Sequence, residues 1–161
     1  MKVLGVSGWS GCGKTTLIVA LIPRLRARGV SGSTLKHAHH VLAIGRRWVL
    51  LHELREEPEP LLAALLARLQ PVDLVLVEGW KTGDYPKLEI WRPVVEDRPP
   101  RFPHDSTIVA VASEPLLDPA AYGRPGLPAF PLADLEGIAG FVAEFARQTR
   151  YGSLVLPCRS K

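Results

Sequence analysis

The residues with the clearest chemistry are the eight at positions 8 to 15. They read Gly-Trp-Ser-Gly-Cys-Gly-Lys-Thr and match the spacing G-x-x-x-x-G-K-[ST] without a gap. In such a loop the glycines let successive backbone N–H groups point inward around phosphate oxygens. Lys14 would place its ammonium on the β- and γ-phosphates, and Thr15 would offer its hydroxyl to Mg²⁺. The pattern predicts a nucleotide site made by Gly8, Trp9, Ser10, Gly11, Cys12, Gly13, Lys14, Thr15 and Thr16.

An acidic residue follows the clearest buried strand that the sequence predicts. Residues 74–77 are four consecutive apolar residues that predict a buried strand, and Glu78 comes next. Ligands of open parallel sheets bind beyond the carboxyl ends of the strands, so Glu78 should face the loop at Gly8. We predict that Glu78 holds Mg²⁺ together with Thr15, or orients an attacking water. The alternative is that Glu78 only caps the strand or pairs with Lys81 or Lys87.

Lys36 ends another predicted strand, and Gly79 directly follows Glu78. Both are predicted to extend the phosphate site, Lys36 through its ammonium. A histidine cluster at 37–40 comes immediately after Lys36 and could suggest a metal site. No second Cys/His cluster with ligand spacing completes a zinc site, so the spacing favours a polar lining beside the phosphates.

Predicted strands alternate with predicted helices along the chain. Short apolar runs predict the strands, and apolar residues at helical spacing predict the helices. The strands are expected at 2–7, 30–36, 73–78, 87–91 and 107–112, with one or two more in 41–51, and the helices at 15–28, 61–69 and 134–147. This order predicts an α/β fold of the P-loop NTPase type, with a largely parallel sheet flanked by helices. One domain is expected over residues 1–151, followed by a C-terminal tail at 152–161.

Composition narrows the class of protein. The 161 residues are 47% hydrophobic and 22% charged, as in a soluble globular domain. No stretch approaches the roughly 18 apolar residues of a membrane span, and no leader precedes the first strand, so we expect a cytoplasmic protein. Two cysteines are too few for a disulfide framework. The net charge of +4 suits a phosphate ligand or an acidic partner. The basic residues are scattered, which makes nucleic-acid binding unlikely.

Five segments resemble the molybdopterin-guanine dinucleotide biosynthesis adaptor family, MobB. They are V-S-G-W-S-G-C-G-K-T-T-L at 6–17, K-H-A-H-H at 36–40, R-W-V-L-L-H-E-L at 47–54, D-L-V-L-V-E-G-W-K at 73–81 and P-K-L-E-I-W-R at 86–92. They occur in the family's order over roughly the first 115 residues. The resemblance implies a P-loop GTP-binding fold, usually a homodimer, that assists the guanylyltransferase attaching GMP to molybdopterin.

The sequence departs from the family at one place. Members usually follow K-H-x-H-H with a segment resembling F-x-x-D-x-P-G-x-D-S, whereas no Asp lies between Lys36 and Asp73 here. That segment would border the γ-phosphate and magnesium, so its loss lowers the expected hydrolysis more than the expected binding. No N/T-K-x-D sequence is present to read guanine, and residues 112–115 are the candidate for that role.

Taken together, these features predict a GTP- and Mg²⁺-binding accessory protein, at most a slow GTPase, that assists formation of molybdopterin guanine dinucleotide. Trp80, Tyr85 and Trp91 are candidates for an exposed surface that contacts the guanylyltransferase, although a core or dimer-interface position is equally open. Two alternatives remain. One is a small P-loop kinase, for which Arg98 and Arg101 would make a poor lid. The other is a metallochaperone-type GTPase, which the histidines favour slightly.

Overall fold

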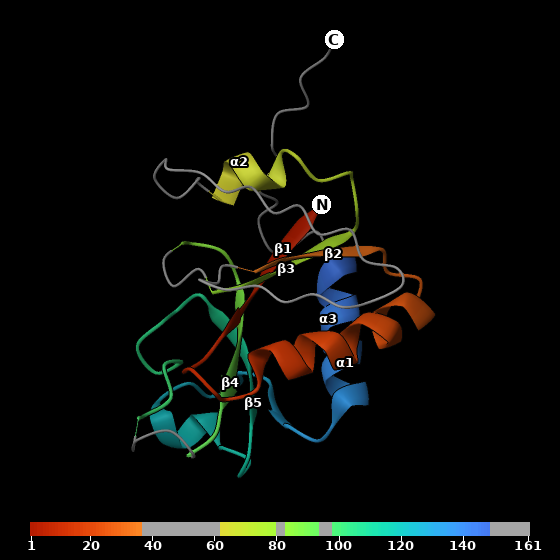
Figure 1. Ribbon diagram of the computed structural model, residues 1–161. Coiled ribbons are helices and arrows are strands. Elements are labelled where there is room, and N and C mark those ends of the chain that lie inside the picture. The colour runs from red at the N-terminus through yellow and green to blue at the C-terminus, as the bar shows by residue number, and fades with distance from the viewer. Residues whose placement is uncertain (37–61, 80–82, 94–97, 149–161) are drawn as a thin grey trace.

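Six parallel strands form a single sheet in the order β2-β3-β1-β4-β5-β6 (Figure 1). The computed structural model describes residues 1–36, 62–79, 83–93 and 98–148. The strands are β1 (Lys2–Ser7), β2 (Gly32–Lys36), β3 (Leu74–Glu78), β4 (Lys87–Trp91), β5 (Ile108–Ser113) and β6 (Ala129–Pro131). The parallel α/β sheet predicted from the sequence is therefore confirmed.

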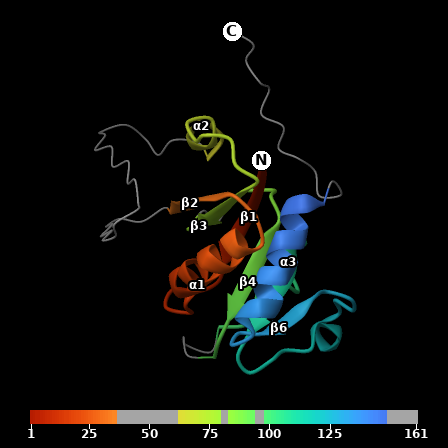
Figure 2. The ribbon, with the colours of Figure 1, turned by 90° about the vertical axis from the view of Figure 1, so that its right-hand side faces the viewer.

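Helices cover both faces of this sheet. They are α1 (Lys14–Ala27), α2 (Leu62–Leu66) and α3 (Leu135–Arg147), with a short 3₁₀ turn η1 (Pro119–Tyr122). Figure 2 shows α1 and α3 side by side across one face. Successive side chains of a strand point to opposite faces, so Leu4 and Leu76 pack in the core below α1 and α3. Val3 and Val75 pack on the other face with Leu66 of α2.

The position of β1 in the sheet determines where ligands can approach. β1 lies between β3 and β4, and all three strands run in the same direction. Their carboxyl ends therefore meet at one edge, and the loop that follows β1 lies between the ends of β3 and β4. Asp73, expected to be structural, lies at the opposite end of β3, where its carboxylate accepts hydrogen bonds from Ser31 N and Oγ at 2.8 and 2.6 Å.

Some predicted elements differ from those observed. The helix predicted over 61–69 is helical only at Leu62–Leu66, and the strand predicted from residue 30 begins at Gly32. η1 and the three-residue β6 were not predicted, because segments this short carry no periodicity. The predicted strands within 41–51 and the tail at 152–161 lie outside the described residues. Within the described part of the chain, every helix is too short or too polar to span a bilayer.

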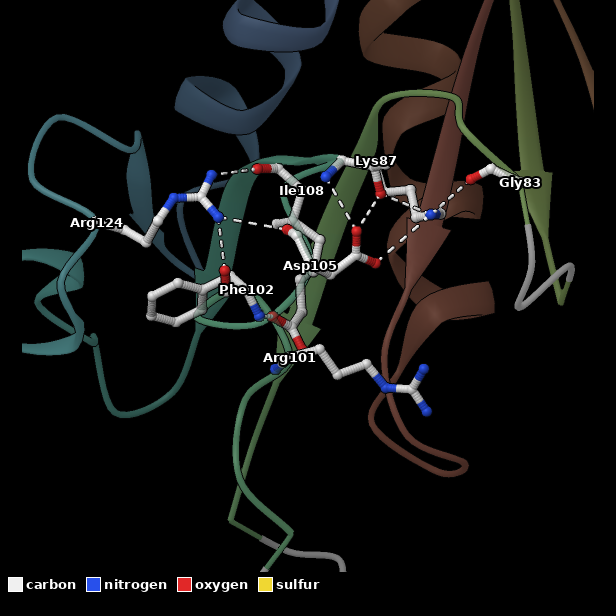
Figure 3. Close-up of polar contacts among 9 residues, drawn as sticks. Gly83, Lys87, Arg101, Phe102, Asp105, Ile108 and Arg124 are labelled. Atoms are coloured by element: carbon white, nitrogen blue, oxygen red, sulfur yellow. Dashed lines mark hydrogen bonds and ion pairs between the residues drawn. The ribbon is translucent and has the colours of Figure 1, made fainter.

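A buried lysine joins the loops that precede β4 and β5 (Figure 3). Lys87 Nζ donates to the Gly83 carbonyl at 2.9 Å and to Thr107 Oγ1 at 2.6 Å, and it lies 3.5 Å from Asp105 Oδ2. Burial alone would raise the pKa of Asp105, but hydrogen bonds from Thr107 and the charge of Lys87 outweigh it and lower that pKa. The pair therefore stabilises the folded state in its charged form.

Arg124 closes the same region from the other side of the loop. Its guanidinium donates to the carbonyls of Phe102, Asp105 and Ile108 at 2.6, 3.3 and 3.0 Å. Three carbonyls are satisfied by one side chain, which fixes the turn between residues 101 and 108. This turn follows β4 in the chain, so its fixed geometry also determines where residues 98–101 lie.

The Lys87 contacts lead to a stability prediction. Replacing Lys87 by Met should lower the free energy of unfolding by about 1–3 kcal/mol, because Gly83 O and Thr107 Oγ1 lose a donor and Asp105 loses its charge partner. Urea unfolding at pH 7 measures the change, and Arg26→Met on the exposed side of α1 is the control, expected to change stability by less than about 0.5 kcal/mol.

The same variant has a signature in acid. A carboxyl with a lowered folded-state pKa stabilises above its unfolded pKa of about 4, and this stability is lost as pH falls through the folded pKa. Removing the Lys87 charge lets the pKa of Asp105 rise toward the unfolded value. As the pH is lowered below about 4, the free energy of unfolding should therefore fall less in Lys87→Met than in the unmodified protein. An equal loss would contradict this assignment.

Candidate functional site

The loop after β1 depends on a position where only glycine fits. Gly8 has φ +143°, and a Cβ built there would lie 2.4 Å from the Ile90 carbonyl oxygen and 2.7 Å from Cys12 Sγ. The chain therefore turns away from β1 against the backbone of β4 itself. Gly11 and Gly13 also have positive φ, at 78° and 98°. This backbone is the curved path that the glycine spacing predicts.

Lys14 lies against the inside of that loop. Its Nζ donates to the carbonyls of Gly8 and Trp9, at 3.1 and 2.7 Å, so the ammonium is held at the Gly8–Trp9 end of the loop. Cys12 is 1% exposed, and burial raises the pKa of its thiol. Cys12 is therefore a small packing residue of the loop, because an activated nucleophile needs a lowered pKa.

The first turn of α1 presents free backbone donors at the same place. The helix begins at Lys14 after Gly13, and no side chain caps its N-terminus within the described residues. Thr15 and Thr16 are both exposed there. Uncapped N–H groups and the positive end of the helix dipole favour an anion. Loop and helix together can thus surround a phosphate group.

Thr15 of α1 and Glu78 of β3 lie next to each other, as predicted. Thr15 Oγ1 donates to Glu78 Oε1 and Oε2 at 2.8 and 2.9 Å, and Glu78 is 7% exposed. Lys36 Nζ donates to Thr15 Oγ1 at 3.0 Å and lies 3.8 Å from Glu78 Oε1. Gly79 follows with φ +97° and turns the chain away from the sheet.

This arrangement fits a magnesium ion. A hydroxyl and a carboxylate converge, and oxygen donors are the ligands that Mg²⁺ prefers. The ammonium of Lys36 already lies beside both oxygen groups, which shows that this position accepts positive charge. Thr15 and Glu78 would hold the ion, and its charge would be placed against the phosphates.

The opposite side of the loop is basic and aromatic, which sequence reasoning missed. Trp9 Nε1 donates to the Pro99 carbonyl at 3.0 Å. The guanidinium carbons of Arg98 and Arg101 lie 4.8 and 4.0 Å from the centroid of the Trp9 ring. Trp91 Nε1 donates to the Arg98 carbonyl at 3.0 Å, which holds the same segment against the end of β4.

A buried carboxylate anchors this basic segment. Glu89 of β4 is fully buried, and its two oxygens accept the backbone N–H groups of Arg101 and Phe102, both at 2.8 Å. Burial raises the pKa of Glu89, although these two hydrogen bonds lower it in part. Glu89 appears in the sequence only as one acid within an apolar strand, so its role carried no sequence signal.

The structure also gives the positions of other residues singled out in the sequence. Of the two positions left open for Tyr85, the core position is the one observed and the exposed one is wrong: Tyr85 is 4% exposed and packs with Val3 and Val77. Trp91 is half-buried as the last residue of β4, and Trp80 lies outside the described residues. Lys87 is not paired with Glu78, since its ammonium contacts Asp105, Thr107 and Gly83 instead. The histidine cluster at 37–40 also lies outside the described residues.

Comparison with known proteins identifies the family. A family model described as molybdopterin guanine dinucleotide synthesis protein B, MobB, matches residues 3–46 and 41–114, more than half of the chain. The chain belongs to the MobB family. The two matched pieces meet just after the histidine cluster, in the segment where the sequence departs from the family pattern. The MobB resemblance predicted from the sequence motifs is therefore confirmed.

Individual MobB relatives are similar over 70% to 92% of the chain. The molybdopterin-guanine dinucleotide biosynthesis adapter protein of Escherichia coli (strain K12) is 34% identical over 174 residues, covering 92% of this chain and 95% of the relative. The Haemophilus influenzae adapter protein is 34% identical over 138 residues, covering 70% and 75%. A crystal structure of a MobB protein homologue from Bacillus stearothermophilus is 29% identical, with a TM-score of 0.66 and coverage of 91% and 99%.

The close contact at Gly8 provides a test of the loop. Gly8→Ala should lower the free energy of unfolding by about 1–3 kcal/mol, because the added methyl cannot coexist with Ile90 O at positive φ. Gly140→Ala in α3 is the matched control, since a Cβ there meets nothing within 4 Å and the helix should gain about 0.5–1 kcal/mol. Thermal unfolding measures both. Equal behaviour of the two variants would show that the loop is not built as described.

Proposed function

We propose that this MobB protein is an adaptor in the biosynthesis of molybdopterin guanine dinucleotide and that it works with GTP and Mg²⁺ bound at the loop after β1. The role as an adaptor follows the relatives, which are named adapter proteins of this biosynthesis. The nucleotide site rests on the geometry of the loop and on the two oxygen donors beside it. We also propose that it is a cytoplasmic homodimer, as the family resemblance implies.

One observation carries the proposed nucleotide site. Thr15 Oγ1 lies within hydrogen-bond distance of both Glu78 oxygens, so a helix N-terminus and a strand end from distant parts of the chain meet beside the glycine loop. A loop with no ligand has no need for this convergence. In P-loop proteins a hydroxyl and an acid in this relation share the magnesium ion that neutralises the phosphates.

The residues divide the work of binding. Lys14 would neutralise the β- and γ-phosphates, and the first-turn N–H groups of α1 would donate hydrogen bonds to phosphate oxygens. Lys36 would turn from Thr15 toward the phosphates once a divalent ion takes over the charge of Glu78. Trp9 closes the outer side of the loop against Pro99. GTP is proposed over other nucleotides because of the family resemblance, with residues 112–115 at the end of β5 as the candidate base contact.

Hydrolysis is proposed to be slow. Positioned acids or glutamines normally orient the attacking water. The sequence has no Asp between Lys36 and Asp73, and Glu78 already accepts the Thr15 hydroxyl with both oxygens. The protein is therefore proposed to hold GTP for the guanylyltransferase and to be, at most, a slow GTPase.

The nucleotide site is tested by removing its central cation. Lys14→Ala should lower GTP affinity by at least about a hundredfold, because a charge-assisted contact to phosphate is lost. Isothermal titration calorimetry with GTP and Mg²⁺ measures the affinity. Arg26→Ala removes an exposed charge at the far end of α1 and should bind GTP like the unmodified protein. Undiminished binding by Lys14→Ala, with a normal melting temperature, would overturn the site.

The adaptor role is tested by reconstitution with the guanylyltransferase. We expect the protein to associate with that enzyme in a pull-down and to raise the yield of molybdopterin guanine dinucleotide when GTP and Mg²⁺ are present. Phosphate release measured in parallel should stay well below the roughly 1 s⁻¹ typical of kinases. If neither association nor stimulation occurs, the adaptor role fails. Transfer of phosphate to an added small molecule would instead support the kinase alternative.

A further inference from the structure

The guanidinium of Arg101 lies beside the loop that follows β1, and its N–H donors are the feature of interest. Its guanidinium stacks on Trp9, but within the described residues it makes no hydrogen bond or ion pair, and its Nε is buried without a partner. Figure 3 shows the Arg101 side chain extending away from the surrounding polar contacts toward the loop that follows β1. A guanidinium carries five N–H donors in a planar fork, which suits phosphate oxygens.

The backbone of Arg101 is held rigidly by groups other than its side chain. Glu89 accepts its N–H at 2.8 Å, and its carbonyl accepts the N–H groups of His104 and Asp105 at 2.9 and 3.1 Å. The next residue, Phe102, is fully buried. A side chain on such a backbone is pre-positioned, so little conformational entropy remains to be lost when it binds an anion.

Arg101 lies at a defined end of the phosphate loop. Lys14 Nζ, the group that meets the β- and γ-phosphates in such loops, is 2.7 Å from the Trp9 carbonyl. The Trp9 side chain carries the Arg101 guanidinium at 4.0 Å. The guanidinium is thus beside the part of the loop that faces the terminal phosphate, on the side opposite Glu78.

Two arginines gather on this side of the loop. The guanidinium groups of Arg98 and Arg101 lie over one indole ring, that of Trp9. Among the described acids close by, the two oxygens of Glu89 are taken by backbone N–H groups, and Glu114 pairs with Arg92 at 3.1 Å. An anion between the ring and the loop would therefore interact favourably with the Arg101 guanidinium.

We propose that Arg101, held on the Trp9 ring, is a specificity residue that contacts the terminal phosphate of a nucleoside triphosphate and so favours GTP over GDP. This rests on the proposed nucleotide site. It assigns a separate task to each side of the loop. Thr15 and Glu78 serve the metal, while Arg101 senses whether a third phosphate is present.

The test is the ratio of GTP to GDP affinity. Arg101→Gln should weaken GTP about tenfold and change GDP by less than twofold, because GDP lacks the phosphate that Arg101 contacts. The backbone hydrogen bonds of residue 101 do not involve its side chain, so the fold should persist, as a melting temperature will check. Arg26→Gln removes the same charge from α1 and should leave both affinities unchanged.

A second variant tests the stacking of Arg101 on Trp9 by changing Trp9. Trp9→Leu removes the ring that positions Arg101 and should lower the GTP-to-GDP ratio in the same direction, whatever it does to overall affinity. If the ratio of GTP to GDP affinity is unchanged in both variants, even with both affinities lowered equally, this inference alone would be overturned. Failure of the unmodified protein to bind either nucleotide would overturn the proposed nucleotide site and this inference with it.

Discussion

The approach of the β1 loop to the backbone of β4 is the constraint on which the candidate site depends. At Gly8 there is no space for even one methyl group, because the Ile90 carbonyl and Cys12 Sγ would lie 2.4 and 2.7 Å from it. This contact fixes the start of the loop against a strand whose first four residues are buried. The loop then reaches Gly13 and the uncapped start of α1, and the Lys14 ammonium lies against its inner face at the Gly8 and Trp9 carbonyls. A phosphate site needs such a rigid, concave run of backbone donors, and the packing of β1 on β4 supplies it.

The order of the strands gives the loop two chemically different sides. β3 brings Glu78 to one side, where Thr15 and Lys36 meet it. β4 leads to Arg101 on the other side, through the segment that Glu89 anchors. Because β1 lies between β3 and β4 in a parallel sheet, both groups arrive at the same edge although they are 23 residues apart in the chain. An anionic side for a metal and a cationic side for phosphate match the charge pattern of a magnesium–nucleotide complex.

The parts of the structure that sequence could predict are those with local signals. Glycine spacing predicts the loop, and four apolar residues before Glu78 predict a buried strand ending at an acid. The role of Glu89 could not be predicted, because its partners are backbone N–H groups twelve and thirteen residues later. For Tyr85 the sequence left an exposed and a core position open, because an aromatic residue suits both. Its ring in fact fills the space beside a glycine on β1, where a Cβ on Gly5 would lie 2.6 Å from it.

The anchoring of the basic segment also bears on whether the proposed adaptor could be a phosphotransfer enzyme. A kinase lid must open to admit an acceptor and close over the phosphates, so its arginines lie on a segment with few fixed contacts. Here the segment bearing Arg101 is tied to a fully buried carboxylate and to Trp9 of the loop itself. Moving it would leave Glu89 buried without its donors, which is costly. Cations fixed in this way suit the holding of a nucleotide better than the opening and closing of a lid over a second substrate, which supports the proposed adaptor role over the kinase alternative.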